Sequence, residues 1–553
     1  MQFRLSHSFQ LPPPPASAEA LLAAAGRHGA AGNWDAAETL CTDLLARQPD
    51  HPEALHLRGV IATRRGQHDD ACGWLERAAA LAPGTARIHY HLGNARLAAG
   101  ALAAAEAAFR QAAALDPDLP EALNNLGNAL KQQDRLAEAI ACYRAVLVRH
   151  PAFAPALYNL GRALTEQGDP AAGVGCLRAA LATPPPPGEE ARIADIHEAL
   201  AAALVELGEH EAAIEASRAL QALAPGKPTG AWNEALSLLA LGRYAEAWPG
   251  YERRWEMPGF RDAEEAGLPP PQVPTLSELA GKRVLLRWEQ GRGDVIQFMR
   301  YATPVSRIAA SVTLCVYPEL RELAASVPGV ACAITDADPE PAHDVAVSLM
   351  SLPLVFATTL ASVPARIPYV TAPEPRRARW RETLAATPGP RVGLCWWGSE
   401  HSRRSSIPLP LLEPLLRVPG ISFHAVQKEI PAAQRGLLAA APSLRDHGAA
   451  LVDFADTAAL LAELDLVITI DTAVAHLAGA LGRPVWILLR RGADWRWLCA
   501  RADSPWYPTA RLFRQGAEGT WEPVVAAART ALEAWRAAQS PQPACLGAPQ
   551  RRG

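Results

Sequence analysis

Several features that would mark other classes of protein are missing from this sequence. Nine cysteines are scattered along 553 residues and none forms a Cys-x-x-Cys pair, so neither a disulfide framework nor a zinc site is indicated. The formal net charge is only −4, which leaves no basic surplus for binding a nucleic acid or an anionic membrane. We expect reduced thiols, as in a cytosol, and no nucleic-acid partner.

Long hydrophobic runs are also missing. Residues 1–17, MQFRLSHSFQLPPPPAS, lack the apolar core of a secretory leader. No later stretch approaches an uncharged apolar span of about 18 residues, the length that a membrane helix needs. We therefore expect a cytoplasmic protein without a membrane span, and disordered ends at residues 1–17 and 538–553.

Signatures of metal and dinucleotide sites are incomplete. Asp336 and Asp338 form an Asp-x-Asp pair, but they lie among loop residues with no strand leading into them. The turn at Gly291 and Gly293 has Ile296 where a G-x-G-x-x-G fingerprint requires its third glycine. We expect neither a metal nor another cofactor.

The first part of the chain repeats itself at an interval of 34 residues. Four kinds of residue keep this interval: Pro49, Pro83, Pro117 and Pro151; Gly59, Gly93, Gly127 and Gly161; the small residues Ala71, Ala105, Ala139 and Gly173; and the bulky Leu75, Phe109, Tyr143 and Leu177. Small residues let paired helices approach closely, the bulky residue fills the groove between them, and proline ends the second helix. The period predicts a helix–turn–helix solenoid over residues 18–257.

Such a solenoid exposes a concave face that usually binds an extended peptide or a partner protein. Asparagines are expected on the first helices of several repeats, where their amides would either hold a peptide backbone or simply face the solvent. These are Asn94, Asn124, Asn125, Asn128 and Asn159. We expect a protein or peptide partner on this face.

The composition changes after a proline-rich linker at residues 258–281. Strand-like runs then alternate with helical ones, which predicts βαβ units and a mostly parallel sheet. The runs are 283–288, 311–316, 344–348, 391–396, 421–426, 465–470 and 485–489. The sequence ATPGP (386–390) separates two halves, 282–387 and 388–537, each of which begins with an apolar strand.

Each half opens with a strand that runs into a glycine turn. In the first half, Gly291 and Gly293 would let backbone amides approach a ligand, and Asp294 stands at the start of the next helix. In the second half, Gly398 is followed by a basic stretch that suits a phosphate or forms a solvated loop. This stretch contains Arg403, Arg404 and Ser405.

The stretch DTAVAHLAGALGRPVWILL (471–489) reads as the turn from a buried strand into a short helix and on to another strand. It places Asp471 at the carboxyl edge of the sheet, where open α/β sheets bind ligands. Asp471 or Thr472 could equally serve as a helix cap, because both residue types are good caps. This stretch alone leaves the two interpretations open.

Six segments in order give a more specific resemblance: EQGRGDVIQFMRYA, VGLCWWGS, RSSIPL, DFADTAALLAELDLVITIDTAVAHLAGALGRPVW, DWRW and SPWYP. Together they resemble the heptosyltransferase-type glycosyltransferases of family 9 over about residues 282–535. The repeats in front resemble tetratricopeptide repeats, as in EALNNLGNALKQQDRLAEAIACYRAVLVRHP (121–151). The likeness is greatest to the bacterial members of the family that carry such repeats before the transferase domain.

This resemblance implies a GT-B fold, in which two Rossmann-like halves face each other across a cleft, with residues 282–387 on the acceptor side and 388–537 on the donor side. It also implies metal-independent, inverting transfer of a sugar from a nucleoside-diphosphate sugar. Asp294 would be the general base. Asp471 would contact sugar hydroxyls, the amides of Thr472 and Ala473 would hold the diphosphate with His476 close by, and Arg403, Arg404 and Ser405 would lie at the phosphates.

The chain departs from the family pattern in three places. Ala473 stands where heptosyltransferases have glycine, the loop at 398–406 is short, and Arg490-Arg491 replaces a more apolar turn. These departures keep an alternative open, in which the repeats are a scaffold attached to a transferase-like domain without turnover.

Overall fold

The computed structural model describes residues 17–183, 190–257, 260, 271–398, 404–439 and 443–539. The predicted disordered ends therefore lie almost entirely outside the described residues, as do Arg403 and much of the predicted linker. The chain forms two compact units, Met1–Ala203 and Leu204–Gly553. Each is described by itself.

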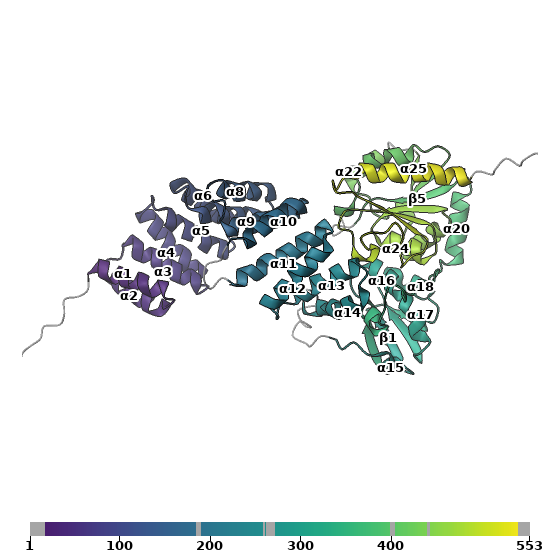
Figure 1. Cartoon of the computed structure of the whole chain (residues 1–553), viewed down its shortest axis with the longest axis horizontal. Helices are drawn as coiled ribbons and strands as arrows, with labels where there is room; N and C mark the ends of the chain where they lie inside the picture. Colours follow the sequence, from purple (N-terminus) through teal and green to yellow (C-terminus); the bar gives the residue numbers. More distant parts are fainter. Residues whose placement is uncertain are drawn as a thin grey trace, which may run out of the picture. The chain divides into compact units, whose positions relative to one another are not determined.

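The first unit is a succession of antiparallel helix pairs, drawn from purple to blue in Figure 1. Its helices are α1 (Ala18–Ala30), α2 (Trp34–Arg47), α3 (Pro52–Arg64), α4 (His68–Leu81), α5 (Ala86–Ala98), α6 (Leu102–Leu115), α7 (Pro120–Gln132), α8 (Leu136–Arg149), α9 (Ala154–Gln167) and α10 (Pro170–Leu181), followed by α11 (Glu190–Leu207), which ends in the second unit. The predicted helix–turn–helix period is confirmed.

The contact inside each pair has the chemistry that the period predicts. A Cβ atom added to Gly127 of α7 would lie 2.5 Å from a ring carbon of Tyr143 on α8. Gly93 and Phe109 have the same relation, also at 2.5 Å. The glycine is therefore required because the aromatic ring of the partner helix occupies the space of a side chain.

The second unit begins with helices that continue the repeat pattern. These are α12 (His210–Leu223), α13 (Pro228–Ala240), α14 (Tyr244–Tyr251) and η1 (Glu252–Glu256). The contacts divide the chain after Ala203, so these helices belong to the same compact unit as the two sheets, and the end of the solenoid at residue 257 stays a prediction. The reason is aromatic packing: Trp248 lies 5.7 Å from Trp495 between ring centroids, and Trp506 Nε1 donates a hydrogen bond of 2.9 Å to Tyr244 Oη.

The first sheet of this unit is parallel, with strand order β3-β2-β1-β4. Its strands are β1 (Arg283–Arg287), β2 (Ser311–Cys315), β3 (Cys332–Ile334) and β4 (Val345–Ser348). Short helices accompany it: α15 (Leu276–Leu279), α16 (Arg292–Phe298), η2 (Met299–Tyr301), α17 (Ala302–Ser306), η3 (Pro318–Leu320), α18 (Arg321–Ala324), η4 (Leu349–Ser351) and α19 (Leu352–Val355).

The second sheet is also parallel, with order β10-β9-β8-β5-β6-β7. Its strands are β5 (Arg391–Cys395), β6 (Ser422–Ala425), β7 (Leu444–Asp446), β8 (Leu466–Ile470), β9 (Val485–Leu489) and β10 (Ala510–Arg514). The helices are α20 (Glu374–Leu384), η6 (Leu409–Leu412), α21 (Glu413–Leu416), α22 (Ala432–Ala439), η7 (Gly448–Ala450), α23 (Phe454–Ala462), α24 (Ala473–Ala480), η8 (Trp495–Trp497) and α25 (Glu522–Gln539).

The predicted α/β region after the repeats is thus confirmed. Three strands that were not predicted from the sequence, β3, β7 and β10, all lie at sheet edges. Edge strands are less enclosed and need no continuous apolar run, so their sequences give a weaker signal. Within the described residues, no helix combines the length and the apolar character needed to cross a membrane.

Arg300 joins the two sheets of the second unit. Its side chain is buried, and its Nη1 donates hydrogen bonds to the carbonyls of Pro364 at 3.2 Å and Trp506 at 2.8 Å. The guanidinium also lies 4.7 Å from the ring centroids of Tyr369 and Tyr507. The halves that carry the candidate site are therefore fixed to each other by a buried cation.

Gly127→Ala should destabilise the repeat unit by about 1–3 kcal/mol, because the added methyl group overpacks against Tyr143. The matched control is Gly73→Ala in α4, where an added Cβ would meet no atom within 4 Å. The control should leave stability unchanged or raise it by about 0.5–1 kcal/mol, since alanine favours a helix interior over glycine. Far-UV circular dichroism during thermal unfolding of the full chain measures both, and equal melting curves for the two variants would contradict the role of the glycine in packing.

Candidate functional site

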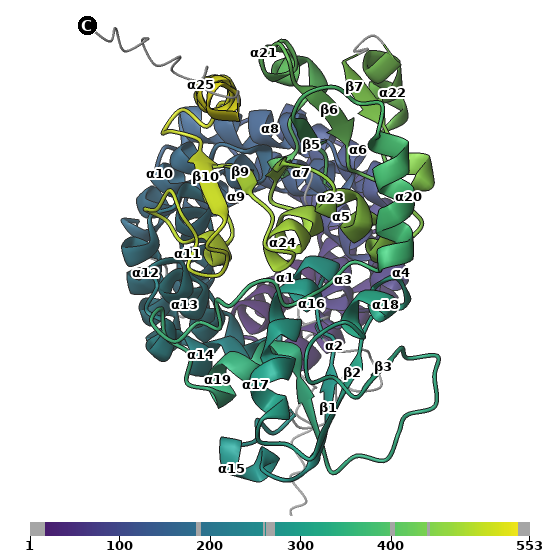
Figure 2. The same ribbon diagram turned by 90° about the vertical axis from the view of Figure 1, so that its right-hand side faces the viewer.

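The glycine turn of the first half and the segment that begins at Asp471 meet at the start of α16 and α24, which lie side by side (Figure 2). Gly291 precedes α16, and its backbone N–H donates a hydrogen bond of 2.8 Å to Asp294 Oδ2. A Cβ atom on Gly293 would lie 2.9 Å from His476 Cδ2 and 3.5 Å from Ala473 Cα. Gly293 therefore allows close contact, which brings the predicted residues Asp294, Ala473 and His476 together.

A buried arginine with no role predicted from the sequence lies at the centre of this contact. Arg496 Nη2 is 2.6 Å from Asp294 Oδ1, and Arg496 Nη1 donates a 2.8 Å hydrogen bond to Asp494 Oδ1. Only 7% of the Arg496 side chain is exposed. The one available signal was its place in the DWRW segment. The ion pair joins the candidate base on the first half to a loop of the second half.

Burial and like charges act on the carboxylates around Arg496. Burial raises the pKa of Asp294 above its usual range, and Arg496 offsets part of this rise. Burial and then the charge of Asp494 raise the pKa of Asp471 to about 7, against smaller opposing effects of Trp497 and Arg496. Arg496 thus lies close to several carboxylates, and burial raises the pKa of both Asp294 and Asp471.

His476 is fixed by aromatic neighbours. Its Nδ1 is hydrogen-bonded to Tyr507 Oη at 3.0 Å, and its ring stacks on Trp497 with 5.1 Å between centroids. Burial, followed by the charges of Arg496 and Arg300, lowers the pKa of His476 well below its usual range. The imidazole is therefore neutral, and its contacts with Tyr507 and Trp497 hold it beside Gly293.

The start of α24 does not follow the capping interpretation. Thr472 is the N-cap residue with an extended backbone, yet its side chain makes no capping hydrogen bond. Its hydroxyl instead lies 3.2 Å from Thr469 Oγ1 and 3.8 Å from Cys395 Sγ. Asp471 stands one residue before the cap. The Thr472 side chain therefore accepts no hydrogen bond from the first backbone N–H groups of α24.

The structure describes only part of the predicted phosphate loop. The backbone N–H of Gly398 donates a 3.0 Å hydrogen bond to Ser406 Oγ. Arg404 is exposed, and its Nη1 lies 4.0 Å from Glu206 Oε2. Ser405 is half-buried beside it. Among the residues predicted for this loop, the structure places Arg404 beside a carboxylate of α11.

Other acidic residues of the first half have structural partners. Glu289, next to the Gly291 turn, forms a buried bidentate ion pair with Arg254 at 2.6 and 2.8 Å and also accepts a hydrogen bond from Ser348. Asp336 accepts hydrogen bonds from Trp288 Nε1 at 2.7 Å and Cys315 Sγ at 3.2 Å. Asp338 accepts one from the Thr335 backbone at 2.8 Å. These carboxylates hold local structure together.

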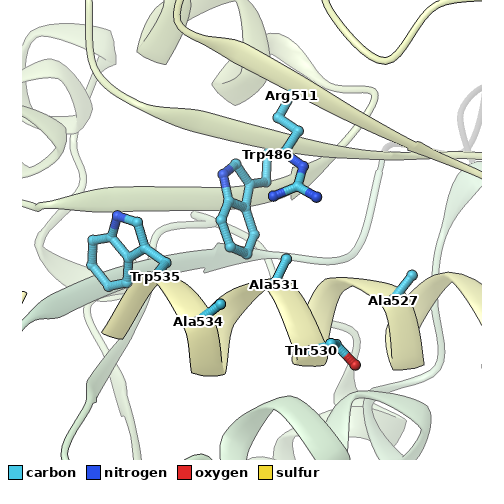
Figure 3. A pocket seen from close by; sticks show the side chains of 7 residues that line it. All are labelled: Trp486, Arg511, Ala527, Thr530, Ala531, Ala534 and Trp535. Atoms are coloured by element: carbon cyan, nitrogen blue, oxygen red, sulfur yellow. The ribbon is translucent and has the colours of Figure 1, made fainter. Parts of the chain in front are cut away.

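A separate open hollow lies between α25 and the strands β9 and β10 (Figure 3). The Arg511 guanidinium lies 5.5 Å from the ring centroid of Trp486 there. The lining residues are Trp486, Arg511, Ala527, Thr530, Ala531, Ala534 and Trp535. All come from the strands and the covering helix and none from the turns around Asp294 and Asp471, so this hollow is not the candidate site.

Comparison with known families finds repeat models in the N-terminal region and a glycosyltransferase model near the C-terminus. Tetratricopeptide repeat models match residues 22–86, 93–134, 124–189 and 166–228, and the model of glycosyltransferase family 9 (heptosyltransferase) matches residues 442–492. The last segment contains Asp471, Thr472, Ala473 and His476. The chain therefore contains tetratricopeptide repeats in its N-terminal region and, in its second unit, a segment that is similar to family 9 glycosyltransferases.

Among curated proteins, the chain is similar to Protein FlbA of Caulobacter vibrioides (strain ATCC 19089 / CIP 103742 / CB 15), with 30% identity over 363 residues, which are 60% of each chain. The chain thus spans about 60% of the length of this relative. Two solved structures are also similar to parts of it: MamA, 24% identical over 29% of this chain and 93% of that one (TM-score 0.27), and the type IV pilus biogenesis factor PilW, 22% identical over 38% and 96% (TM-score 0.35).

The raised pKa of Asp471 makes the stability of the second unit depend on pH. The folded protein keeps the proton of Asp471 up to about pH 7, whereas an unfolded aspartate loses it near pH 4. This contribution to stability is complete below the unfolded pKa and is lost as the pH rises through the folded value. Asp471→Asn should therefore raise the melting temperature relative to wild type more at pH 8 than at pH 5. Differential scanning calorimetry at both values measures this, and an equal shift at both would contradict a protonated Asp471.

Proposed function

We propose that the second unit is an inverting glycosyltransferase that moves a sugar from a nucleoside-diphosphate sugar to an acceptor hydroxyl. The observation that carries the proposal is the close approach of Gly293, the residue before Asp294 on α16, to Ala473 and His476 of α24. This approach supports a site shared by Asp294 and the heptosyltransferase-type segment, which contains both α24 residues. The GT-B arrangement of the two sheets belongs to this proposal.

The donor would lie at the carboxyl ends of β8 and β9. The amides of Thr472 and Ala473 and the positive end of α24 suit a diphosphate, because a helix N-terminus attracts anions. Asp471, one residue earlier, would accept hydrogen bonds from sugar hydroxyls. The neutral His476 would limit the space on the side of Gly293.

The reaction would proceed by one displacement. Asp294 takes the proton of the acceptor hydroxyl while that oxygen forms a bond to the anomeric carbon, and the bond to the diphosphate breaks with its electron pair leaving on the diphosphate. The attack comes from the face opposite the leaving group, so the configuration inverts. Arg496 would hold Asp294 in place and offset part of the rise that burial causes in its pKa.

The repeats would recruit the acceptor or a partner protein. Side-chain amides form a chain across α5, α7 and α9: Asn125 donates to Asn94 at 2.8 Å, Asn124 to Asn125 at 3.1 Å and Asn159 to Asn124 at 2.9 Å. The remaining amide groups of such a chain suit a peptide backbone, which has donors and acceptors at regular spacing. A cytoplasmic location stays a prediction.

The alternative is a binding scaffold without turnover. It is favoured by the ion pair of Asp294 with Arg496, since a base that is already neutralised by a cation attracts a proton less strongly. Incubating the protein with a panel of nucleotide sugars and measuring the release of nucleoside diphosphate decides between the two. Release with a defined donor supports the enzyme, and no release with any donor or acceptor supports the scaffold.

Asp294→Asn should lower kcat by at least about 10²-fold, because the amide cannot accept the proton, while donor affinity changes little. The matched control is Asp503→Asn, which removes an exposed carboxylate that pairs with Arg501 in the same unit. Steady-state kinetics together with calorimetry of donor binding measures both quantities. Unchanged turnover, or affinity lost in parallel with rate, would show that Asp294 is not the base.

Asp471→Ala should weaken binding of the intact nucleotide sugar by roughly 10–150-fold at a pH above 7, where Asp471 is ionised, because hydrogen bonds to a charged group are lost. Binding of the bare nucleoside diphosphate should change much less, because Asp471 is assigned to the sugar. Isothermal titration calorimetry with both ligands tests this. An equal loss for the two ligands would remove Asp471 from sugar recognition.

A further inference from the structure

Two arginines and one glutamate form an ionic cluster at the carboxyl edge of the second sheet. Arg490 Nη1 lies 2.6 Å from Glu206 Oε2, and Arg490 Nη2 lies 3.4 Å from Glu206 Oε1. Arg404 Nη1 approaches the same Oε2 at 4.0 Å. The carboxylate of Glu206 is thus an anion held by two cations that come from different loops.

The sheet order shows where this cluster lies. β5 and β9 flank β8 on either side. Arg404 belongs to the loop that follows β5, and Arg490 directly follows β9. Ile470, the last residue of β8, is paired in register with Leu488 of β9. Arg490 therefore stands at the same edge as Thr472, where α24 begins.

The last turn of α11 is also held at the carboxyl edge of the second sheet by contacts to its backbone. Gly492 has φ +63°, and a Cβ atom there would lie 2.2 Å from the carbonyl oxygen of Glu206. Arg491 Nε donates a 2.9 Å hydrogen bond to the carbonyl of Leu207, and its Nη1 donates another of 2.9 Å to the carbonyl of Ala517. The backbone of Glu206 is thus held by Gly492 and Arg491, while its carboxylate is held by Arg490 and Arg404.

We propose that Arg490 and Arg404 bind the diphosphate of the donor together with the amides of Thr472 and Ala473, and that Glu206 occupies the two arginines as an internal anion until the donor displaces it. The proposal rests on the proposed function. It accounts for Arg490-Arg491, the departure from the family pattern: Arg491 fixes the helix end, and Arg490 provides the exchangeable cation.

Exchange is physically reasonable because the cluster is open to solvent. The exposed fractions are 26% for the Arg490 side chain, 31% for Glu206 and 50% for Arg404. Ion pairs that solvent screens in this way are weak. A diphosphate carries more negative charge than one carboxylate and offers more acceptor oxygens to two guanidinium groups, so it competes effectively.

The test is calorimetric titration of the full chain with inorganic pyrophosphate at low ionic strength, which probes the anion site without a base or a sugar. Glu206→Gln keeps the shape of the side chain but removes its charge, and it should tighten pyrophosphate binding by about threefold or more. Arg490→Ala and Arg404→Gln should each weaken it by about threefold or more. Glu211→Gln is the matched control, since Glu211 is an exposed acid on α12 whose loss changes the net charge equally.

Equal pyrophosphate affinities for wild type, Glu206→Gln and Glu211→Gln would overturn the role of Glu206. Unchanged binding in Arg490→Ala and Arg404→Gln would overturn the site itself. Thermal unfolding identifies any variant whose helix end is lost, and Arg404→Gln provides a second variant at a side chain that is 50% exposed. If pyrophosphate responds as expected while no nucleotide sugar is turned over, the anion site stands and the proposed enzyme fails. If a nucleotide sugar is turned over while the variants leave pyrophosphate binding unchanged, the proposed enzyme stands and the anion site fails.

Discussion

The guanidinium of Arg496 lies almost completely buried between the carboxylates of Asp294 and Asp494, and the candidate site depends on this arrangement. Without the cation, burial would drive protons onto the carboxylates, since an isolated charge is costly in a protein interior. Removing one partner of such a buried pair commonly costs about 3–5 kcal/mol, because the remaining charge is left uncompensated. Arg496 therefore determines both the position of the candidate base and the charge around Asp471.

Buried arginines recur through the second unit in the same role. Arg254 joins η1 to Glu289 after β1, Arg300 joins the first sheet to Trp506, and Arg496 joins η8 to Asp294. Each connects segments that are far apart in the sequence. Arg254 and the aromatic cluster of Trp248, Tyr244 and Trp506 explain why repeat-like helices belong to the same compact unit as the two sheets. The planar guanidinium suits this use because it donates in several directions and stacks on aromatic rings.

The two units differ in how their contacts relate to the sequence. Each repeat pair in the first unit is formed by neighbouring helices, as in the contact of Gly127 with Tyr143. The second unit instead gathers residues from α11 to β10 around one sheet edge. A solenoid of local contacts presents one extended face, whereas long-range contacts produce a compact site with buried charges. The extended face suits the partner binding that we propose for the repeats, and the compact site suits the reaction that we propose for the second unit.

The sequence by itself determined the architecture wherever the signal is local. A 34-residue spacing of glycine and bulky residues is sufficient for helix pairs, and a short apolar run is sufficient for each strand that leads to Asp294 or Asp471. The motifs also selected Asp294, Ala473 and His476, which the structure brings together. The assigned roles of these residues remain predictions.

Only the tertiary structure decided which charges neutralise which. Arg496 pairs with Asp294, and Arg490 pairs with Glu206. The partners of each pair are far apart in the chain, so no sequence spacing predicts either ion pair. Edge strands, the division of the chain after Ala203 and the unused cap position at Thr472 were likewise settled by packing between distant segments. The physical reason is that local sequence fixes backbone geometry, whereas the burial and pairing of charged groups depend on which distant segments fold against each other.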